Sequence, residues 1–212
     1  MAPEVTNRGR AETTQVLGRL GRSTIRAAAA VLASGGIAVL PTDTIYGFHC
    51  AASKSRAIEG ILELKGSRRR EGFILLAADA AMAASLVARW PGASRETLGR
   101  IWPAPLTAIL PARTMLSPLL APRGKVAVRV PALADLRDLI AALGEPLVST
   151  SVNRSGGEPM ASIADIREAF PGLGGYLSRR GRPSSRPSTI VDFTARDPVL
   201  VRAGRRPWPA AR

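Results

Sequence analysis

Apolar residues recur along the middle of the chain at two spacings, one typical of helices and one typical of buried strands. Ile58, Ile61 and Leu62 share one face of a segment with helical spacing, whereas residues 37–40 form a short continuous apolar run. The first pattern predicts an amphipathic helix, and the second predicts a buried strand. On this basis we expect helices over 54–65 and 133–143. Four more helices are expected from the cap Ser23 to about residue 35, from Asp79 to about 90, from Ser94 to about 101 and from Ser162 to about 170. The expected strands cover residues 37–40, 73–77, 106–110, 126–130, 147–149, 189–193 and 199–202.

This alternation of helices and strands predicts an α/β layered fold with strands of mixed direction. The chain has 212 residues and shows no internal repeat or long linker, which favours one domain. We expect a flexible basic arm over 1–20, the folded domain over 21–204 and a basic tail over 205–212. Because no apolar run approaches the roughly 18 residues that a membrane span requires, and the first ten residues are polar, we expect no membrane association and a cytoplasmic location.

The formal net charge of +14 is the strongest compositional signal, and it predicts anionic partners. Of the 30 basic residues, all but Lys54, Lys65 and Lys125 are arginines, whose planar guanidinium suits phosphate and carboxylate groups. With only 3 Trp, 2 Tyr and 4 Phe, the chain has few side chains on which single-stranded bases could stack. Contacts with a nucleotide or with a phosphate backbone are therefore favoured.

The single cysteine, Cys50, and the single histidine, His49, limit the chemistry further. One cysteine excludes an internal disulfide, and the pair leaves no Cys/His set for zinc. We expect no protein-bound metal site and interpret His49 as a packing residue.

Polar peptides near the ends of the expected elements are the candidate functional segments. In open α/β sheets, ligands commonly bind beyond the ends of the strands. Taken singly, each peptide also has an ordinary structural explanation, because basic residues complement a helix C-terminus and hydroxyl groups bond to turns. The peptides cover residues 41–47, 65–70, 102–107, 149–156, 188–192 and 201–204.

Taken together, the order and spacing of these peptides resemble the YrdC/TsaC family of L-threonylcarbamoyladenylate synthases, over roughly residues 23–204. The family's Pro-Thr-(Asp/Glu)-Thr-x-Tyr-Gly peptide matches residues 41–47, and its Lys-x-Arg element begins at Lys65. Its Pro-Gly-Pro-x-Thr and Val-Arg-x-Pro peptides resemble 103–107 and 128–131. Its Ser-Thr-Ser-Ala-Asn-x-Ser-Gly, Ser-Thr-Ile-Val-Asp and Arg-x-Gly peptides resemble 149–156, 188–192 and 202–204. Several ordered motifs are a specific signal where one alone is weak.

The resemblance implies a fold, a reaction and partners. The fold would be a single YrdC-like domain, a twisted mixed sheet flanked by helices with a basic concave cavity. The reaction would join ATP, L-threonine and bicarbonate into threonylcarbamoyl-AMP and pyrophosphate, for the threonylcarbamoyl modification of a tRNA adenosine. Mg²⁺ would accompany ATP, and the implied partners are tRNA or double-stranded RNA and downstream threonylcarbamoyl-transferase proteins.

The resemblance also assigns roles to single residues. The contacts with threonine or its carbamate fall on Thr42, Tyr46, Ser151 and Ser188. The contacts with ATP fall on Lys65, Thr107, Asn153, Ser162 and Arg202, with Lys65 as the main catalytic cation. Arg68, Arg69 and Arg129 are further candidate anion contacts, although Arg129 is equally well explained as a strand-face arginine paired elsewhere.

One departure from the family pattern leaves an alternative function open. Ser67 stands where Lys-x-Arg has its arginine, and Arg68 or Arg69 could reach the same space after a shift of one residue. If they do not, the chain is a catalytically weakened or inactive relative that acts as an RNA-binding protein. In either case we expect the basic tail after Gly204 to contribute to RNA affinity and not to adenylate formation.

Overall fold

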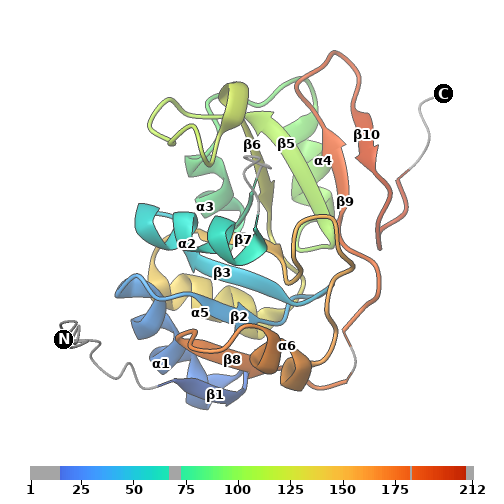
Figure 1. The fold of residues 1–212 in the computed structure, drawn as a ribbon. Coiled ribbons are helices and arrows are strands. Elements are labelled where there is room, and N and C mark those ends of the chain that lie inside the picture. The colour runs from blue at the N-terminus through green and yellow to red at the C-terminus, as the bar shows by residue number, and fades with distance from the viewer. Residues whose placement is uncertain (1–14, 67–72, 182, 209–212) are drawn as a thin grey trace, which may run out of the picture.

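Ten strands form one mixed sheet in the computed structural model, which describes residues 15–66, 73–181 and 183–208. The strand order is β1-β8-β2-β3-β7-β4-β6-β5-β9-β10, so β1 and β10 lie at opposite edges (Figure 1). Four neighbouring pairs are parallel and five are antiparallel, which confirms the predicted α/β class with strands of mixed direction. The strands are β1 (Val16–Arg19), β2 (Ala38–Leu40), β3 (Gly47–Ala51), β4 (Ile74–Leu76), β5 (Leu106–Pro111), β6 (Lys125–Arg129), β7 (Leu147–Ser151), β8 (Gly175–Ser178), β9 (Thr189–Asp192) and β10 (Val199–Arg202).

The helices begin and end where the capping residues allow. Asp79 accepts a hydrogen bond of 2.8 Å from the Met82 amide, and Gly66 and Gly144 adopt the left-handed conformation that ends two of the helices. None of the helices in the described ranges is long and apolar enough to cross a membrane. The helices are α1 (Arg22–Ala33), α2 (Ser55–Lys65), α3 (Ala80–Ser85), α4 (Ser94–Ile101), α5 (Ala134–Leu143) and α6 (Ile163–Ala169), with a 3₁₀ turn η1 over Pro122–Gly124.

Three predicted helix boundaries were wrong. α4 begins at Ser94 itself, with Ala93 before it, so Ser94 is not the cap of this helix. α1 begins at Arg22 rather than after Ser23, because Thr24 Oγ1 accepts a hydrogen bond from the Gly21 amide. α3 ends at Ser85 rather than near residue 90, because Val87 forms a bridge with Ala112. Pairing with another part of the sheet overrides the local helical pattern there.

The predicted boundaries of the domain also shift. β1 lies inside the expected flexible arm, where it pairs in parallel with β8. Residues 205–208 of the expected tail lie against the domain, with Trp208 in edge contact with Phe193 at 5.7 Å between ring centroids. Residues 1–14 and 209–212 lie outside the described residues. β1, β3 and β8 were not predicted: β1 and β8 have four residues each, and β3 carries His49 at its centre.

The two faces of the sheet carry different layers. Strand residues such as Val39, Phe48 and Val148 point to one face, where they form a core with buried residues of α2, α4 and α6. Their neighbours Leu40 and Leu147 point to the other face, where they pack with α1 and α5. Burying each large apolar side chain contributes about 1.5–3 kcal/mol. α1 and α5 cover the β1-β8-β2 side of the second face (Figure 1), and the cavity described below lies on that face farther along the sheet.

His49 is a fully buried residue of β3, consistent with its interpretation as a packing residue. Its Nε2 lies 3.1 Å from Ser149 Oγ, and burial lowers the pKa of the imidazole to about 3. Acid therefore favours the unfolded protein, because this histidine stays neutral in the folded protein but binds a proton near pH 6.5 in the unfolded chain.

We therefore expect the free energy of unfolding to fall as the pH drops below about 6.5, with a slope that approaches about 1.4 kcal/mol per pH unit. Between about pH 7.5 and pH 5 the loss from His49 alone is about 2 kcal/mol. Urea unfolding of the wild type and of His49→Gln across this range measures it. The free energy of unfolding of His49→Gln should fall less steeply with pH than that of the wild type. Parallel pH profiles of the two proteins would contradict the assignment of this loss to His49.

Candidate active site

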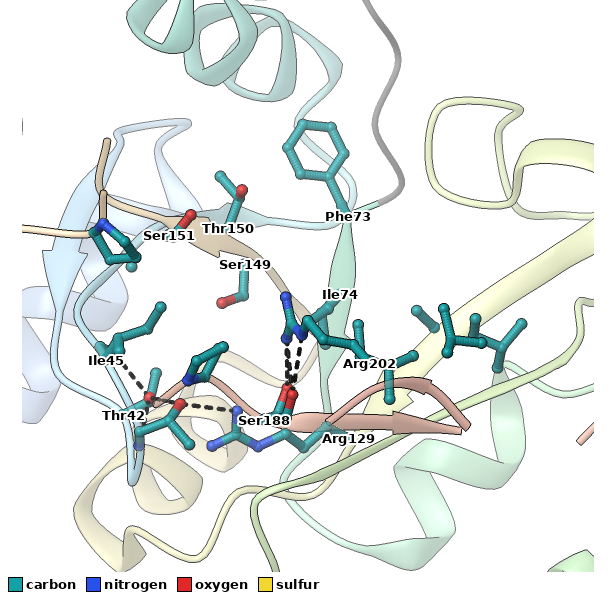
Figure 2. A pocket seen from close by; sticks show the side chains of 18 of the residues that line it. Thr42, Ile45, Phe73, Ile74, Arg129, Ser149, Thr150, Ser151, Ser188 and Arg202 are labelled. Carbon is teal, nitrogen blue, oxygen red and sulfur yellow. Dashed lines mark hydrogen bonds between the residues drawn. The ribbon is translucent and has the colours of Figure 1, made fainter. Parts of the chain in front are cut away.

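Strand register builds the floor of a cavity. Ser149, Ile74, Ala127, Ile109 and Asp192 lie opposite one another on β7, β4, β6, β5 and β9 in that order. All five line one cavity of about 660 Å³, a size typical of small-molecule sites. Figure 2 shows Ser149 and Ile74 at its inner surface.

Five of the six predicted peptides contribute to the walls of this cavity, and the peptide 102–107 does not. They come from the loop after β2, the end of α2, the loop after β7, the residue before β9 and the end of β10. Segments far apart in the sequence therefore meet around one space (Figure 2). The predicted residues that line it are Thr42, Tyr46, Lys65, Arg129, Ser151, Asn153, Ser188 and Arg202.

Lys65 places a buried cation at one end of the cavity. Its Nζ donates to Asn153 Oδ1 at 2.9 Å, to the Ser151 carbonyl at 3.1 Å and to the Asn153 carbonyl at 3.3 Å. The Lys65 carbonyl accepts from the Ser155 amide at 2.8 Å. The end of α2 and the loop after β7 are thus one hydrogen-bonded unit that carries a positive charge.

Asn153 orders the loop in which it lies. Its side-chain amide nitrogen donates to the carbonyls of Arg154 at 2.9 Å and Gly157 at 2.6 Å, and its Oδ1 also accepts from Ser151 Oγ at 2.5 Å. Such a polar network fixes the loop before any ligand binds.

The loop after β2 is organised around Thr42. Its hydroxyl donates to the Ile45 carbonyl at 2.8 Å and accepts from the Thr44 amide at 3.0 Å. The next residue, Asp43, forms an ion pair with Arg129 of β6, and Arg129 also donates to Thr44 Oγ1 at 3.2 Å. Arg129 therefore lines the cavity and is also paired with Asp43. Its two interpretations from the sequence, an anion contact and a strand-face arginine paired elsewhere, each describe part of its position.

Arg202 and Ser188 form the opposite wall. The Arg202 guanidinium donates to the Ser188 carbonyl at 2.9 Å and to its hydroxyl at 3.2 Å (Figure 2). Burial, and then the nearby charge of Arg129, lower the pKa of Arg202. Burial lowers the pKa of Arg129 too, although Asp43 opposes the shift. Guanidinium groups close enough to repel one another create a positive potential that attracts anions.

Two predicted residues do not line the cavity. Thr107 is fully buried behind Ser188, with 2.9 Å between the two hydroxyl oxygens, so its position supports Ser188. Ser162 caps α6 by accepting from the Asp165 amide at 3.4 Å, which commits its hydroxyl to the helix end. Arg68, Arg69 and Ser67 lie outside the described residues.

Three further charged residues line the cavity: Arg123 and Lys125, which the motifs did not mark, and Asp192, the last residue of the predicted peptide 188–192. Lys125 donates to Asp192 at 3.0 Å. Lys125, Ala127 and Arg129 alternate with valines along β6, and this pattern could have placed Lys125 beside Arg129. Arg123 carried no comparable signal, since it lies in the turn η1 with a positive φ of 57°.

Metal-ligating side chains are scarce around the cavity. Among the described residues, no group of three His, Cys, Asp or Glu side chains is placed to hold a metal ion. Asp192 is the carboxylate among the cavity residues, and its oxygens accept hydrogen bonds from Lys125 and Thr194. The cavity therefore offers cations, hydroxyls and amides to an anionic ligand.

Comparisons with known proteins agree with this picture. A Sua5/YciO/YrdC family model, described as telomere recombination, matches residues 30–204. A protein from Nitrosococcus oceani named threonylcarbamoyl-AMP synthase is 37% identical over 166 residues, which cover 76% of this chain and 90% of that protein. One of the same name from Halorhodospira halophila is 38% identical over 147 residues, which cover 69% of this chain and 77% of that protein.

Solved structures show the same fold. Sua5 from P. abyssi complexed with L-threonine superposes with a TM-score of 0.83 at 29% identity, covering 90% of this chain. This chain spans 58% of that protein's length. E. coli YciO superposes with a TM-score of 0.77 at 24% identity, covering 90% of this chain and 94% of that one, and at this identity it supports the fold alone.

Proposed function

The chain belongs to the Sua5/YciO/YrdC family, and from this premise we infer that it is a nucleotidyltransferase that forms threonylcarbamoyl-AMP. The observation that carries the inference is the meeting of Lys65, Arg129 and Arg202 with the hydroxyls of Thr42 and Ser188 in one cavity. Relatives at this identity carry the synthase name. The alternative of a non-catalytic RNA-binding relative is accordingly not favoured.

We propose that the substrates are ATP, L-threonine and bicarbonate. The threonine amine and bicarbonate give a carbamate with loss of water. An oxygen of this carbamate attacks the α-phosphorus of ATP, and the bond to the pyrophosphate oxygen breaks. The products are threonylcarbamoyl-AMP and pyrophosphate.

The chemistry matches the residue types of the cavity. The attacking carbamate, the phosphate under attack and the leaving pyrophosphate are all negatively charged. The protein therefore needs oriented cations and hydrogen-bond donors more than a dedicated acid or base. Lys65 supplies such a cation at the loop of Ser151 and Asn153, where we place the ATP phosphates. The loop that carries Thr42 and Tyr46 and the wall that carries Ser188 both face the threonine end in this proposal.

Mg²⁺ fits this scheme as a companion of ATP. Because Asp192 already bonds to Lys125 and Thr194, the metal would be held mainly by phosphate oxygens and water. When bound, Mg²⁺ supplies neutralisation of charge on the pyrophosphate leaving group. The chain's own residues would orient the carbamate and the α-phosphate.

We propose that the product serves tRNA adenosine modification, with downstream transferase proteins as recipients. The net charge of +14 supports contact with an RNA backbone. Threonylcarbamoyl-AMP is a reactive mixed anhydride, and its chemistry requires a later step that transfers the threonylcarbamoyl group to an acceptor.

A pyrophosphate-release assay tests the proposal. We expect release that requires ATP, threonine, bicarbonate and Mg²⁺ together, with the rate near background when any one is omitted. Chelation of Mg²⁺ should leave the melting temperature of the substrate-free protein unchanged, because the described residues contain no metal cluster. Release that persists without threonine, or RNA binding with no release at all, would contradict the synthase function.

A further inference from the structure

The segment over residues 204–208, which we call the C-terminal strap, crosses from the end of β10 back over the start of β9. The Arg205 amide donates to the Pro187 carbonyl at 2.8 Å, and the Gly204 amide donates to Thr189 Oγ1 at 3.2 Å. The Thr189 hydroxyl in turn donates to the carbonyl of Arg206. The strap is thereby fastened on both sides of Ser188.

The fit between the strap and Ser188 is close. A Cβ added to Gly204 would lie 2.4 Å from the carbonyl carbon of Ser188 and 2.5 Å from the Pro187 carbonyl oxygen. Glycine is therefore required here by space, since real Cβ atoms do not approach so closely. At its other end, the strap is anchored by the edge contact of Trp208 with Phe193.

From this fixed base, Arg205 reaches the opposite wall of the cavity. Its guanidinium donates to the main-chain carbonyl of Asp43, in the loop after β2. The preceding carbonyl, that of Thr42, accepts from Arg179 at 2.8 Å. Two arginines from distant parts of the chain thus hold two successive carbonyls of one loop.

We propose that Arg205 is a positioning residue for the threonine end of the cavity. By joining the strap to Asp43, it sets the distance between the loop that carries Thr42 and the wall that carries Ser188. This role rests on the proposed function, in which these two walls face threonine. It differs from the expectation that the residues after Gly204 contribute to RNA affinity and not to adenylate formation.

The effect should be selective for one substrate. The strap contacts the loop after β2 and the start of β9, whereas the side chains of Lys65 and Asn153 are held by hydrogen bonds to the loop after β7. One main-chain hydrogen bond, from the Val152 amide to the Tyr46 carbonyl at 3.3 Å, joins the two loops. Loss of the Arg205 contact should therefore weaken threonine binding and leave ATP binding close to its original value. The effect should also be partial, because Arg179 continues to hold the Thr42 carbonyl.

The test compares Arg205→Ala with Arg206→Ala, which removes the same charge one residue away and keeps the main-chain carbonyl that Thr189 uses. We expect Arg205→Ala to raise the KM for threonine about fivefold to tenfold, as loss of a charge-assisted hydrogen bond commonly does, with the KM for ATP changed less than about twofold. Arg205→Lys should restore most of the loss, because an ammonium can also donate to a carbonyl. Arg206→Ala should behave as the wild type in adenylate formation.

Amide hydrogen exchange on the substrate-free proteins separates this inference from the proposed function. Arg205→Ala should speed exchange of the Thr44 amide, which bonds within the loop, and leave the Ser155 amide beside Lys65 unchanged. If the wild type released no pyrophosphate, the proposed function would fail. The exchange of the Thr44 amide would still show whether Arg205 orders the loop after β2. Unchanged Thr44 exchange, equal rises of both KM values, or equal effects of Arg205→Ala and Arg206→Ala would each overturn the positioning role.

Discussion

Replacing Lys65 with alanine is expected to reduce turnover by a factor of about 10² to 10³ while the protein stays folded. The Lys65 side chain is buried at the cavity and already held by Asn153 and the loop of Ser151, so its position is fixed before substrates bind. A cation fixed in this way stabilises negative charge that develops in the transition state without reorganisation. The measurement is threonine-dependent pyrophosphate release at saturating ATP.

Lys54 provides a matched control, since it lies at the other end of α2. Lys54→Ala removes the same charge from the same helix and should keep turnover within about twofold of the wild type. Because Lys65 also orders the loop after β7, urea unfolding of both variants should accompany the assay. A Lys65→Ala protein that is folded and turns over like Lys54→Ala would contradict the catalytic role of Lys65.

Local patterns in the sequence predicted most of the elements that carry the site. The apolar spacing gave α2 to within one residue, and the alternation along β6 put Ala127 and Arg129 on one face. These signals work because helix and strand periods act over a few residues. The four-residue strands β1 and β8 escaped prediction, because they pair with each other although they are distant in the sequence. β3 escaped it as well, although it has five residues and pairs both with the nearby β2 and with the distant β7.

The placement of the site residues depended on long-range register, which no local pattern encodes. Thr107 and Ile109 share one face of β5, yet Thr107 is covered by Ser188 while Ile109 lines the cavity. The sequence pattern assigned Arg205 to a tail, because its partners are the main-chain carbonyls of Asp43 and Pro187, which carry no side-chain signature. Main-chain contacts of this kind become visible only in three dimensions.

The largest effect on stability is expected from Asp43→Ala, which removes the carboxylate paired with Arg129. Both side chains are nearly inaccessible, at 9% and 4% exposure. Asp43 Oδ2 and Arg129 Nε already lack hydrogen-bond partners among the described residues. Deleting the carboxylate would leave the buried guanidinium of Arg129 without its paired negative charge. Such a loss commonly lowers the free energy of unfolding by about 3–5 kcal/mol. That loss is a large fraction of a typical total stability of about 5–15 kcal/mol.

Urea unfolding of two further variants separates this effect from a general loss of charge. Glu96→Ala breaks an exposed ion pair with Arg100, 2.5 Å long, and should cost less than about 1 kcal/mol. Asp43→Ala combined with Arg129→Met should recover most of the stability, because an apolar side chain needs no compensation in that position. The double variant should remain poor in threonine-dependent release, since it lacks a cation of the cavity wall. If Asp43→Ala lost no more stability than Glu96→Ala, Asp43 would not be the group that compensates the buried charge of Arg129.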